Sequence, residues 1–368
     1  MKNNYWIVDE WLIFKPEFNE ELINYYDIIN KYKKIMFSNY DNSLIAIETN
    51  NKYKEKYHNN YIRDIFNKEI DLSNNINLTH LSFGWSFNKE IDLSNNINLL
   101  YLTFRYCFNK KINLLNNINL TYLTFGYYFN KKIDLSNNKN LIYLSFGFNF
   151  NQEINLLNNI NLTYLSFKNL FNKEVDLSKN INLIYLTFAA CFNKKIDLSN
   201  NKNLIYLAFG LNFNQEIDLS NNKNLTHLAF GNYFNQEINL LNNINLIDLT
   251  FGKYFNKNID IPLNIKNLNM NRCNNQYIID NLHNNIKELK IENSNLNLDN
   301  LPNSIKKIYI YKYYKELNNL PNSIEYLELR NYKLKIKKIP KSLKTIKCDK
   351  DYKYINDFKD YEVITFIY

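Results

Sequence analysis

Residues 66–86 read FNKEIDLSNNINLTHLSFGWS, and the Phe-Asn pair that opens them returns every 21 residues. The ten copies follow one another without insertion or deletion, beginning at Phe66, Phe87, Phe108, Phe129, Phe150, Phe171, Phe192, Phe213, Phe234 and Phe255. A fixed period of this size is typical of stacked repeats. The sequence therefore predicts a solenoid, and a solenoid is more often an extended binding surface than a catalytic centre.

Each copy holds one strand motif, which is clearest when the opening Phe is numbered position 1. Positions 13, 16 and 18 read Leu-x-x-Leu-x-Phe, as in Leu78, Leu81 and Phe83. Alternate inward side chains predict a short strand, and the motif resembles a leucine-rich repeat. The run 70–72, Ile-Asp-Leu, predicts a shorter extended segment on the other side of the coil, and Asn-Asn between them predicts a turn. The expected fold is a mainly β leucine-rich-repeat solenoid.

Three further positions carry structural expectations. All six glycines lie at position 19, which predicts a positive φ or a close approach between coils. Asn at position 2 is expected to point inward and bond backbone groups of the turn and of the neighbouring coil. Phe at positions 1 and 18 is expected to form two stacked aromatic columns in the core.

The last third of the chain continues the repeat with a shorter turn. Residues 320–329 read LPNSIEYLEL, and equivalent motifs recur at a spacing that settles at 19 residues. Strand motifs are predicted in register from Leu78 to Cys348. Together with residues 78–88, LTHLSFGWSFN, this motif resembles the FNIP repeat, a leucine-rich-repeat variant familiar from social amoebae and giant DNA viruses that infect them. The resemblance covers residues 62–350, but position 4 is Glu or Lys in most copies where the family name implies Pro.

Residues 1–61 lack the repeat and have two interpretations. Residues 19–36 carry apolar side chains near helical spacing, and residues 37–49 suggest a strand. The segment is either a small α/β N-terminal cap, which an open solenoid core needs, or a degenerate F-box. The resemblance implies the F-box, which would recruit a cullin-type ubiquitin ligase, but the usual Leu-Pro opening is absent. The predicted divisions are 1–61, the 21-residue repeats 62–260, the 19-residue repeats 261–350 and a C-terminal cap or tail 351–368.

The charge of the chain is uneven. The formal net charge is +9, and residues 301–350 alone hold 13 Lys/Arg and 4 Asp/Glu, so 13 − 4 = +9. A basic patch of this kind can bind nucleic acid or an acidic partner. Its alternative is a solvated lysine edge that blocks strand addition at the open end of the solenoid. The candidate residues are Lys333, Lys335, Lys337, Lys338 and Lys341.

Two exposed surfaces are candidates for protein binding. In the strand motif, the side chains at positions 15 and 17 are expected to point outward. Position 17 holds small residues, most of which carry a hydroxyl. Position 15 forms a column of tyrosines, a residue type that suits protein recognition: Tyr101, Tyr122, Tyr143, Tyr164, Tyr185 and Tyr206. The alternative role of these tyrosines is cross-strand stacking alone. Copies differ most at positions 20 and 21, just past the strand. The preferred binding patch is the aromatic rim formed by Trp85, Tyr106, Tyr127 and Phe148.

Catalytic and cofactor motifs are absent from the sequence. We expect no nucleophile with a base within reach, no phosphate loop and no metal or cofactor, since neither C-x-x-C nor a Cys/His cluster occurs. No signal peptide or transmembrane segment is recognisable, so the expected location is intracellular, in host cytoplasm. The expected function is a non-enzymatic protein-interaction scaffold, with a host protein as a candidate partner. A ubiquitin-ligase substrate receptor is the second hypothesis and nucleic-acid binding the third.

Overall fold

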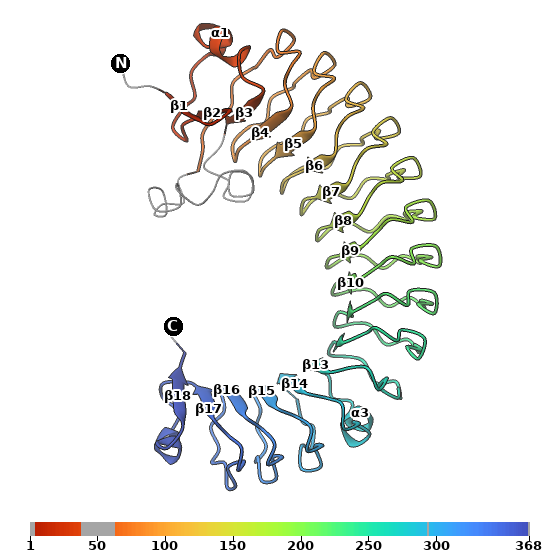
Figure 1. Ribbon diagram of the computed structural model, residues 1–368, viewed down its shortest axis with the longest axis vertical. Helices are drawn as coiled ribbons and strands as arrows, with labels where there is room; N and C mark the ends of the chain where they lie inside the picture. The colour runs from red at the N-terminus through yellow and green to blue at the C-terminus, as the bar shows by residue number, and fades with distance from the viewer. Residues whose placement is uncertain (1–3, 38–62, 293, 367–368) are drawn as a thin grey trace. The chain divides into compact units, whose positions relative to one another are not determined.

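The computed structural model describes residues 4–37, 63–292 and 294–366. The chain divides into two compact units, Met1–Leu183 and Ile184–Tyr368, and each is described by itself. In both units a coil contributes one short strand, and mostly irregular chain leads to the next strand (Figure 1). Each unit is therefore a mainly β solenoid, as the repeat predicts.

The first unit begins with an antiparallel pair, β1 and β2, and continues from β2 to β8 as parallel neighbours. A 3-10 turn (η1, Leu22–Asn24) and a one-turn helix (α1, Tyr26–Ile29) connect β2 to β3. The strands are β1 Tyr5–Val8, β2 Trp11–Phe14, β3 Lys34–Phe37, β4 His80–Phe83, β5 Tyr101–Phe104, β6 Tyr122–Thr124, β7 Tyr143–Phe146 and β8 Tyr164–Phe167.

The second unit pairs its strands in parallel from β9 to β18. It also contains a short helix, α3 (Gln276–Asp280), and a 3-10 turn, η2 (Ile355–Phe358). The strands are β9 Tyr185–Phe188, β10 Tyr206–Phe209, β11 His227–Ala229, β12 Asp248–Phe251, β13 Asn267–Asn271, β14 Glu288–Glu292, β15 Lys307–Tyr311, β16 Tyr326–Arg330, β17 Thr345–Cys348 and β18 Glu362–Thr365.

The strand register confirms both repeat lengths. Tyr101 pairs with Tyr122, 21 residues on, and Lys307 pairs with Tyr326, 19 residues on. The predicted strand motifs correspond to β4–β17. The sequence did not predict β18, which adds one more parallel strand from the expected C-terminal tail.

The core confirms the two aromatic columns. Rings at position 18 stack on one another, as Phe83 does on Phe104 at 5.4 Å between ring centroids. Rings at position 1 stack likewise, with Phe87 and Phe108 at 6.0 Å. The columns also contact each other within a coil, since Phe83 and Phe87 lie 3.8 Å apart. These rings are almost fully buried and interlock successive 21-residue coils within each unit.

Asparagine side chains form ladders between coils, and the sequence analysis identified one of them. At position 2, the half-buried Asn67 accepts a hydrogen bond through its Oδ1 from the backbone N–H of Asn88 at 2.9 Å. This is the expected bond to the backbone of the neighbouring coil. The fully buried asparagine is instead at position 10, within the segment predicted only as a turn. There Asn96 Nδ2 donates to the carbonyls of Leu72 and Asn75 in the preceding coil, at 2.9 and 2.8 Å. These residues are part of the core, where Nδ2 of Asn96 is paired and its buried Oδ1 accepts no hydrogen bond from the described residues.

The glycines at position 19 permit close packing between coils. No described glycine has a positive φ, so that half of the expectation is wrong. A Cβ added to Gly147 would lie 1.8 Å from the carbonyl oxygen of Gly126, which is backbone and cannot move aside cheaply. Among the described non-glycine residues, positive φ occurs at Asp9, Arg272, Lys312 and Asn331.

The N-terminal segment differs from the sequence expectation. The helix predicted over 19–36 is reduced to η1 and α1, and its end becomes β3. Burial of Ile35 and Met36 together with pairing to β4 accounts for this change, because tertiary packing overrides a weak helical period. The strand expected over 37–49 lies outside the described residues, apart from Phe37 in β3. The run at 70–72 alternates in burial but forms no strand.

Aspartates at position 6 close a local turn and make stability depend on pH. Backbone N–H groups of the serines two residues on donate to Asp71, Asp134, Asp176 and Asp218 at 2.8–2.9 Å. These bonds and those from the serine hydroxyls lower the pKa of each carboxyl. A lowered folded-state pKa contributes stability above the unfolded value of about 3.9, and this stability is lost as pH falls through the folded value.

Exchanging these four aspartates for asparagine should reduce the acid sensitivity of the fold. Asparagine already makes the same bond in other coils, as Asn113 does with the Leu115 N–H at 3.0 Å. We expect a similar melting temperature at pH 7 and, below pH 4, a melting temperature a few degrees above that of the wild type. Circular dichroism melts at a series of pH values measure this. Parallel pH profiles for the two proteins would contradict the assignment.

Candidate functional site

The aromatic rim predicted from the variable positions is assembled in the first unit. Trp85, Tyr106, Tyr127 and Phe148 follow the ends of β4–β7, and successive rings stack at 3.8, 4.7 and 4.5 Å. The Arg63 guanidinium lies 4.6 Å from the Trp85 ring and extends the stack. Stacking follows from register, because one position recurs at the same height on each strand.

Backbone bonds beneath the rim fix its spacing. The N–H of Cys107 donates to the Trp85 carbonyl at 2.9 Å, and the N–H of Tyr128 donates to Tyr106 at the same distance. All four rim residues are half-buried. Tyr128, which is 42% exposed, meets the Tyr106 ring edge-on at 5.1 Å. Partial desolvation is the main cause that raises the pKa of the Tyr106 hydroxyl, and the electrostatic interaction with Tyr128 raises this pKa further. The rim is thus a preformed apolar surface with hydroxyl groups at its margin.

The tyrosines at position 15 stack face to face. In the first unit Tyr101, Tyr122, Tyr143 and Tyr164 have centroid separations of 4.0, 4.2 and 4.0 Å. In the second unit the Tyr185 and Tyr206 rings lie 4.5 Å apart. Each inner ring face is covered by its neighbour, so the column presents ring edges and hydroxyls rather than flat faces.

The small side chains at position 17 are less exposed than predicted. Ser82, Thr103 and Ser166 are buried, while Thr124 and Ser145 are half-buried. The expectation of an exposed column beside the tyrosines is therefore wrong for the buried members. Large tyrosine rings next to a short side chain account for part of this shielding, since both lie on one face of the strand.

One hydroxyl does have a base within reach, contrary to expectation. Thr226 Oγ1 lies 2.7 Å from His227 Nδ1, and His227 Nε2 lies 2.9 Å from Asp248 Oδ2. The same hydroxyl is 3.2 Å from the Ile205 carbonyl, to which it can also donate, and the His227 side chain is 49% exposed. Thr79 and His80 repeat the local contact at 2.9 Å. The arrangement follows from adjacent Thr and His residues on a strand, and the exposed imidazole makes it a surface contact.

The candidate basic patch is largely neutralised within the chain. Lys333 pairs with Asp351 at 3.2 Å, Lys335 with Asp357 at 3.3 Å and Lys337 with Glu316 at 2.7 Å. Within the described residues, Lys338 and Lys341 have no ion-pair partner. Three of the five candidate lysines therefore have a carboxylate neighbour that lowers the positive field around them.

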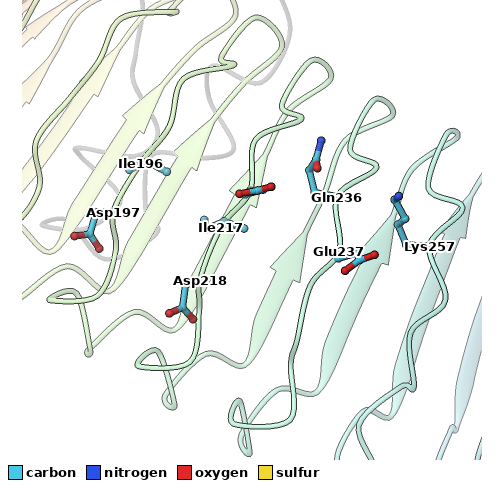
Figure 2. Close-up of a pocket in the computed structure, with 8 residues that line it drawn as sticks. Ile196, Asp197, Ile217, Asp218, Gln236, Glu237 and Lys257 are labelled. Atoms are coloured by element: carbon cyan, nitrogen blue, oxygen red, sulfur yellow. The ribbon is translucent and has the colours of Figure 1, made fainter.

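The structure also reveals an acidic depression that the sequence analysis missed. Carboxylates of Asp197, Asp218 and Glu237 come from successive coils and line a hollow of about 730 Å³, with Lys257 at its edge (Figure 2). The sequence signal was present at positions 4 and 6, where acidic residues recur in successive copies. The described residues contain no His, Cys, Asp and Glu cluster suited to a metal ion.

A second unpredicted feature is a polar network on the strands of the second unit. The carboxylate of Glu328, which is 6% exposed, accepts hydrogen bonds from the hydroxyls of Tyr311 and Tyr326 at 2.6 and 2.7 Å. Lys347 lies 3.6 Å away. Desolvation, followed by these bonds, raises the pKa of both tyrosines. Every member is partnered, so the network is a structural element rather than an open ligand site.

Comparison with known proteins supports the repeat type. Residues 293–332 match the FNIP Repeat family model. The crystal structure of CroV588, a giant-virus protein described as a novel circular LRR protein, is 27% identical with a TM-score of 0.56. The match covers 95% of this chain and 61% of that one, so the chain spans about three fifths of CroV588. The fold is thus a leucine-rich-repeat solenoid, with an FNIP repeat recognised in the second unit.

Two internalins of Listeria monocytogenes are more distant. InlJ is 19% identical, with 74% of this chain and 68% of InlJ covered and a TM-score of 0.49. InlF is 17% identical, with 83% of this chain and 85% of InlF covered and a TM-score of 0.45. No curated protein matches the sequence. None of the described helices has the length and apolar character needed to cross a bilayer.

Proposed function

We propose that this leucine-rich-repeat solenoid is a non-enzymatic scaffold that binds a protein partner through its aromatic rim. The observation that carries the proposal is the continuous stack of Trp85, Tyr106, Tyr127 and Phe148, half-exposed and extended by Arg63. Trp, Tyr and Arg are the residue types that dominate binding energy at protein interfaces.

The stacked arrangement favours recognition because it is already ordered. Each ring is held by its neighbours, so a partner loses little side-chain entropy in ordering the site. Ring edges supply apolar contact, and the hydroxyls of Tyr106 and Tyr127 supply directional bonds. The tyrosine column offers a second row of edges and hydroxyls on the strands, which would widen the contact surface.

The F-box hypothesis is not favoured by a specific contact. Residues 4–37 provide β1–β3, and β3 pairs with β4, so this part of the segment continues the solenoid sheet. The remainder, residues 38–62, lies outside the described residues, and both the cap and the F-box stay predictions. Nucleic-acid binding is weakened by the ion pairs of Lys333, Lys335 and Lys337.

Replacing the four rim residues with serine should abolish partner capture. We expect at least a roughly tenfold lower recovery of the specific partner when the tagged variant is incubated with amoebal lysate and bound proteins are quantified by mass spectrometry. A matched control replaces four exposed isoleucines of the same unit with serine, at Ile76, Ile97, Ile118 and Ile160, which are 48–57% exposed.

The control distinguishes the rim from general surface hydrophobicity. Wild type and control should recover the same partner, while circular dichroism should show that all three proteins are folded. Equal recovery by the rim variant would overturn the site assignment. Recovery of cullin-ligase subunits by wild type and rim variant alike would point instead to the F-box hypothesis.

A further inference from the structure

A shallow apolar groove lies in the second unit, at the edge where the chain enters β12, β13 and β14. It has a volume of about 320 Å³, and its apolar lining comes from Ile244, Ile247 and Leu263. Ile244 is 63% exposed and Leu263 is 68% exposed. This edge precedes the strands, whereas the aromatic rim follows the strands of the first unit, so the two surfaces are separate in sequence and position on the strand.

The groove coincides with the change in repeat length. The turn before β12 runs six steps from Leu240 to Leu246, whereas the turn before β13 runs four steps from Ile261 to Ile265. Pro262 occupies the shorter turn, whose Ile265 N–H donates to the Pro262 carbonyl at 3.0 Å. A short turn beside a long one produces a step, and the exposed aliphatic side chains lie at this step.

Lysines give the groove a positive margin. Lys266 and Lys287 line it directly. Within the described residues neither of these two has an ion-pair partner. Lys306, the next lysine along the same edge, is by contrast paired with Glu325 at 2.8 Å.

The backbone around the groove is already satisfied. The N–H groups of Lys266 and Lys287 donate to the carbonyls of Ile247 and Lys266, at 3.0 and 2.7 Å. A ligand would therefore not be recognised by strand addition here. The groups available to a ligand are the aliphatic side chains and the lysine ammonium groups. The Nδ2 group of Asn285 already donates to the Leu263 carbonyl at 2.9 Å.

We propose that this groove binds a short acidic peptide segment of a partner protein through an aliphatic anchor flanked by carboxylates. The anchor packs on Ile244 and Leu263, and the carboxylates pair with Lys266 and Lys287. Charge complementarity selects this occupant, because unpaired lysines beside an apolar surface attract carboxylates and disfavour a basic segment. The groove is open and shallow, which suits a peptide side chain better than an enclosed acyl chain.

The test is a fluorescence-polarisation titration of the full chain with the labelled peptide Glu-Glu-Leu-Leu-Glu-Glu. Two matched peptides, with serine in place of leucine or lysine in place of glutamate, should bind at least about tenfold more weakly. Lys266→Glu with Lys287→Glu, and separately Leu263→Ser, should each raise the Kd of the acidic peptide about tenfold or more. The control variant Lys132→Glu with Lys195→Glu makes the same charge change at exposed positions elsewhere and should leave the Kd unchanged.

The outcomes separate this site from the aromatic rim. The serine variant of the rim should bind the peptide as wild type does, so failure of one proposal does not entail failure of the other. Absence of saturable binding, or equal binding by the Lys266→Glu/Lys287→Glu variant, would overturn the inference. Sedimentation showing a dimer that Leu263→Ser dissociates would assign the groove to a second copy of the chain and would also overturn it.

Discussion

Phe129→Ala should lower the free energy of unfolding of the first unit by about 3–5 kcal/mol. The Phe129 ring is fully buried and lies 3.9 Å from Phe125 within its coil. It also stacks between Phe108 and Phe150, each at 6.0 Å. Alanine would remove contacts with three rings at once and leave a cavity that rigid neighbouring coils cannot close.

Urea unfolding followed by tryptophan fluorescence measures this loss, because Trp6, Trp11 and Trp85 all belong to the first unit. The adjacent Tyr128 gives a matched control, since it is 42% exposed. Tyr128→Ala should cost no more than about 1 kcal/mol. Similar losses for the two variants would contradict the interlocked aromatic core.

Asn138→Ala should lower the free energy of unfolding by about 2–4 kcal/mol, the sum of two buried hydrogen bonds and a small cavity. Asn138 Nδ2 donates to the carbonyls of Leu114 and Asn117 at 2.9 and 2.8 Å, and the residue is fully buried. Without the carboxamide, both carbonyls lose one partner in a site closed to water.

The neighbouring residue again supplies the control. Asn137 Nδ2 donates to the Leu115 carbonyl at 3.1 Å, but on the exposed side of the turn, where water can replace it. Asn137→Ala should therefore cost less than about 1 kcal/mol in the same urea titration. Equal effects at the two positions would mean that the buried ladder contributes no more than a surface bond.

The strands and the aromatic columns were predictable because a repeat multiplies a weak local signal. One Leu-x-x-Leu-x-Phe motif is ambiguous, whereas the same motif at a constant interval determines which residues lie side by side. Register alone places Trp85, Tyr106, Tyr127 and Phe148 at equivalent positions of neighbouring coils. Their stacking at 3.8–4.7 Å follows from that register.

The sequence was least informative where the repeat was absent or where partners lay in another coil. Residues 19–36 occur once, so periodicity could not separate a helix from the buried end that pairs as β3. The ion pairs of the candidate basic patch could not be read from a charge count, because the partner of Lys337 is Glu316, which lies 21 residues earlier in another coil. The buried asparagine at position 10 was overlooked because Asn-Asn is also common turn chemistry.

The asparagine ladders have a direction, and this bears on how the chain changes in evolution. At positions 2 and 10 the later coil donates and the earlier coil accepts, as between Asn88 and Asn67 and between Asn96 and Asn75. Every regular coil within a unit is therefore acceptor for its successor and donor to its predecessor. A duplicated coil meets a compatible neighbour on both sides, and residues 129–154 and 192–217 are nearly identical in sequence. Gene duplication in whole coils can thus lengthen the solenoid while the interfaces between its regular coils stay the same.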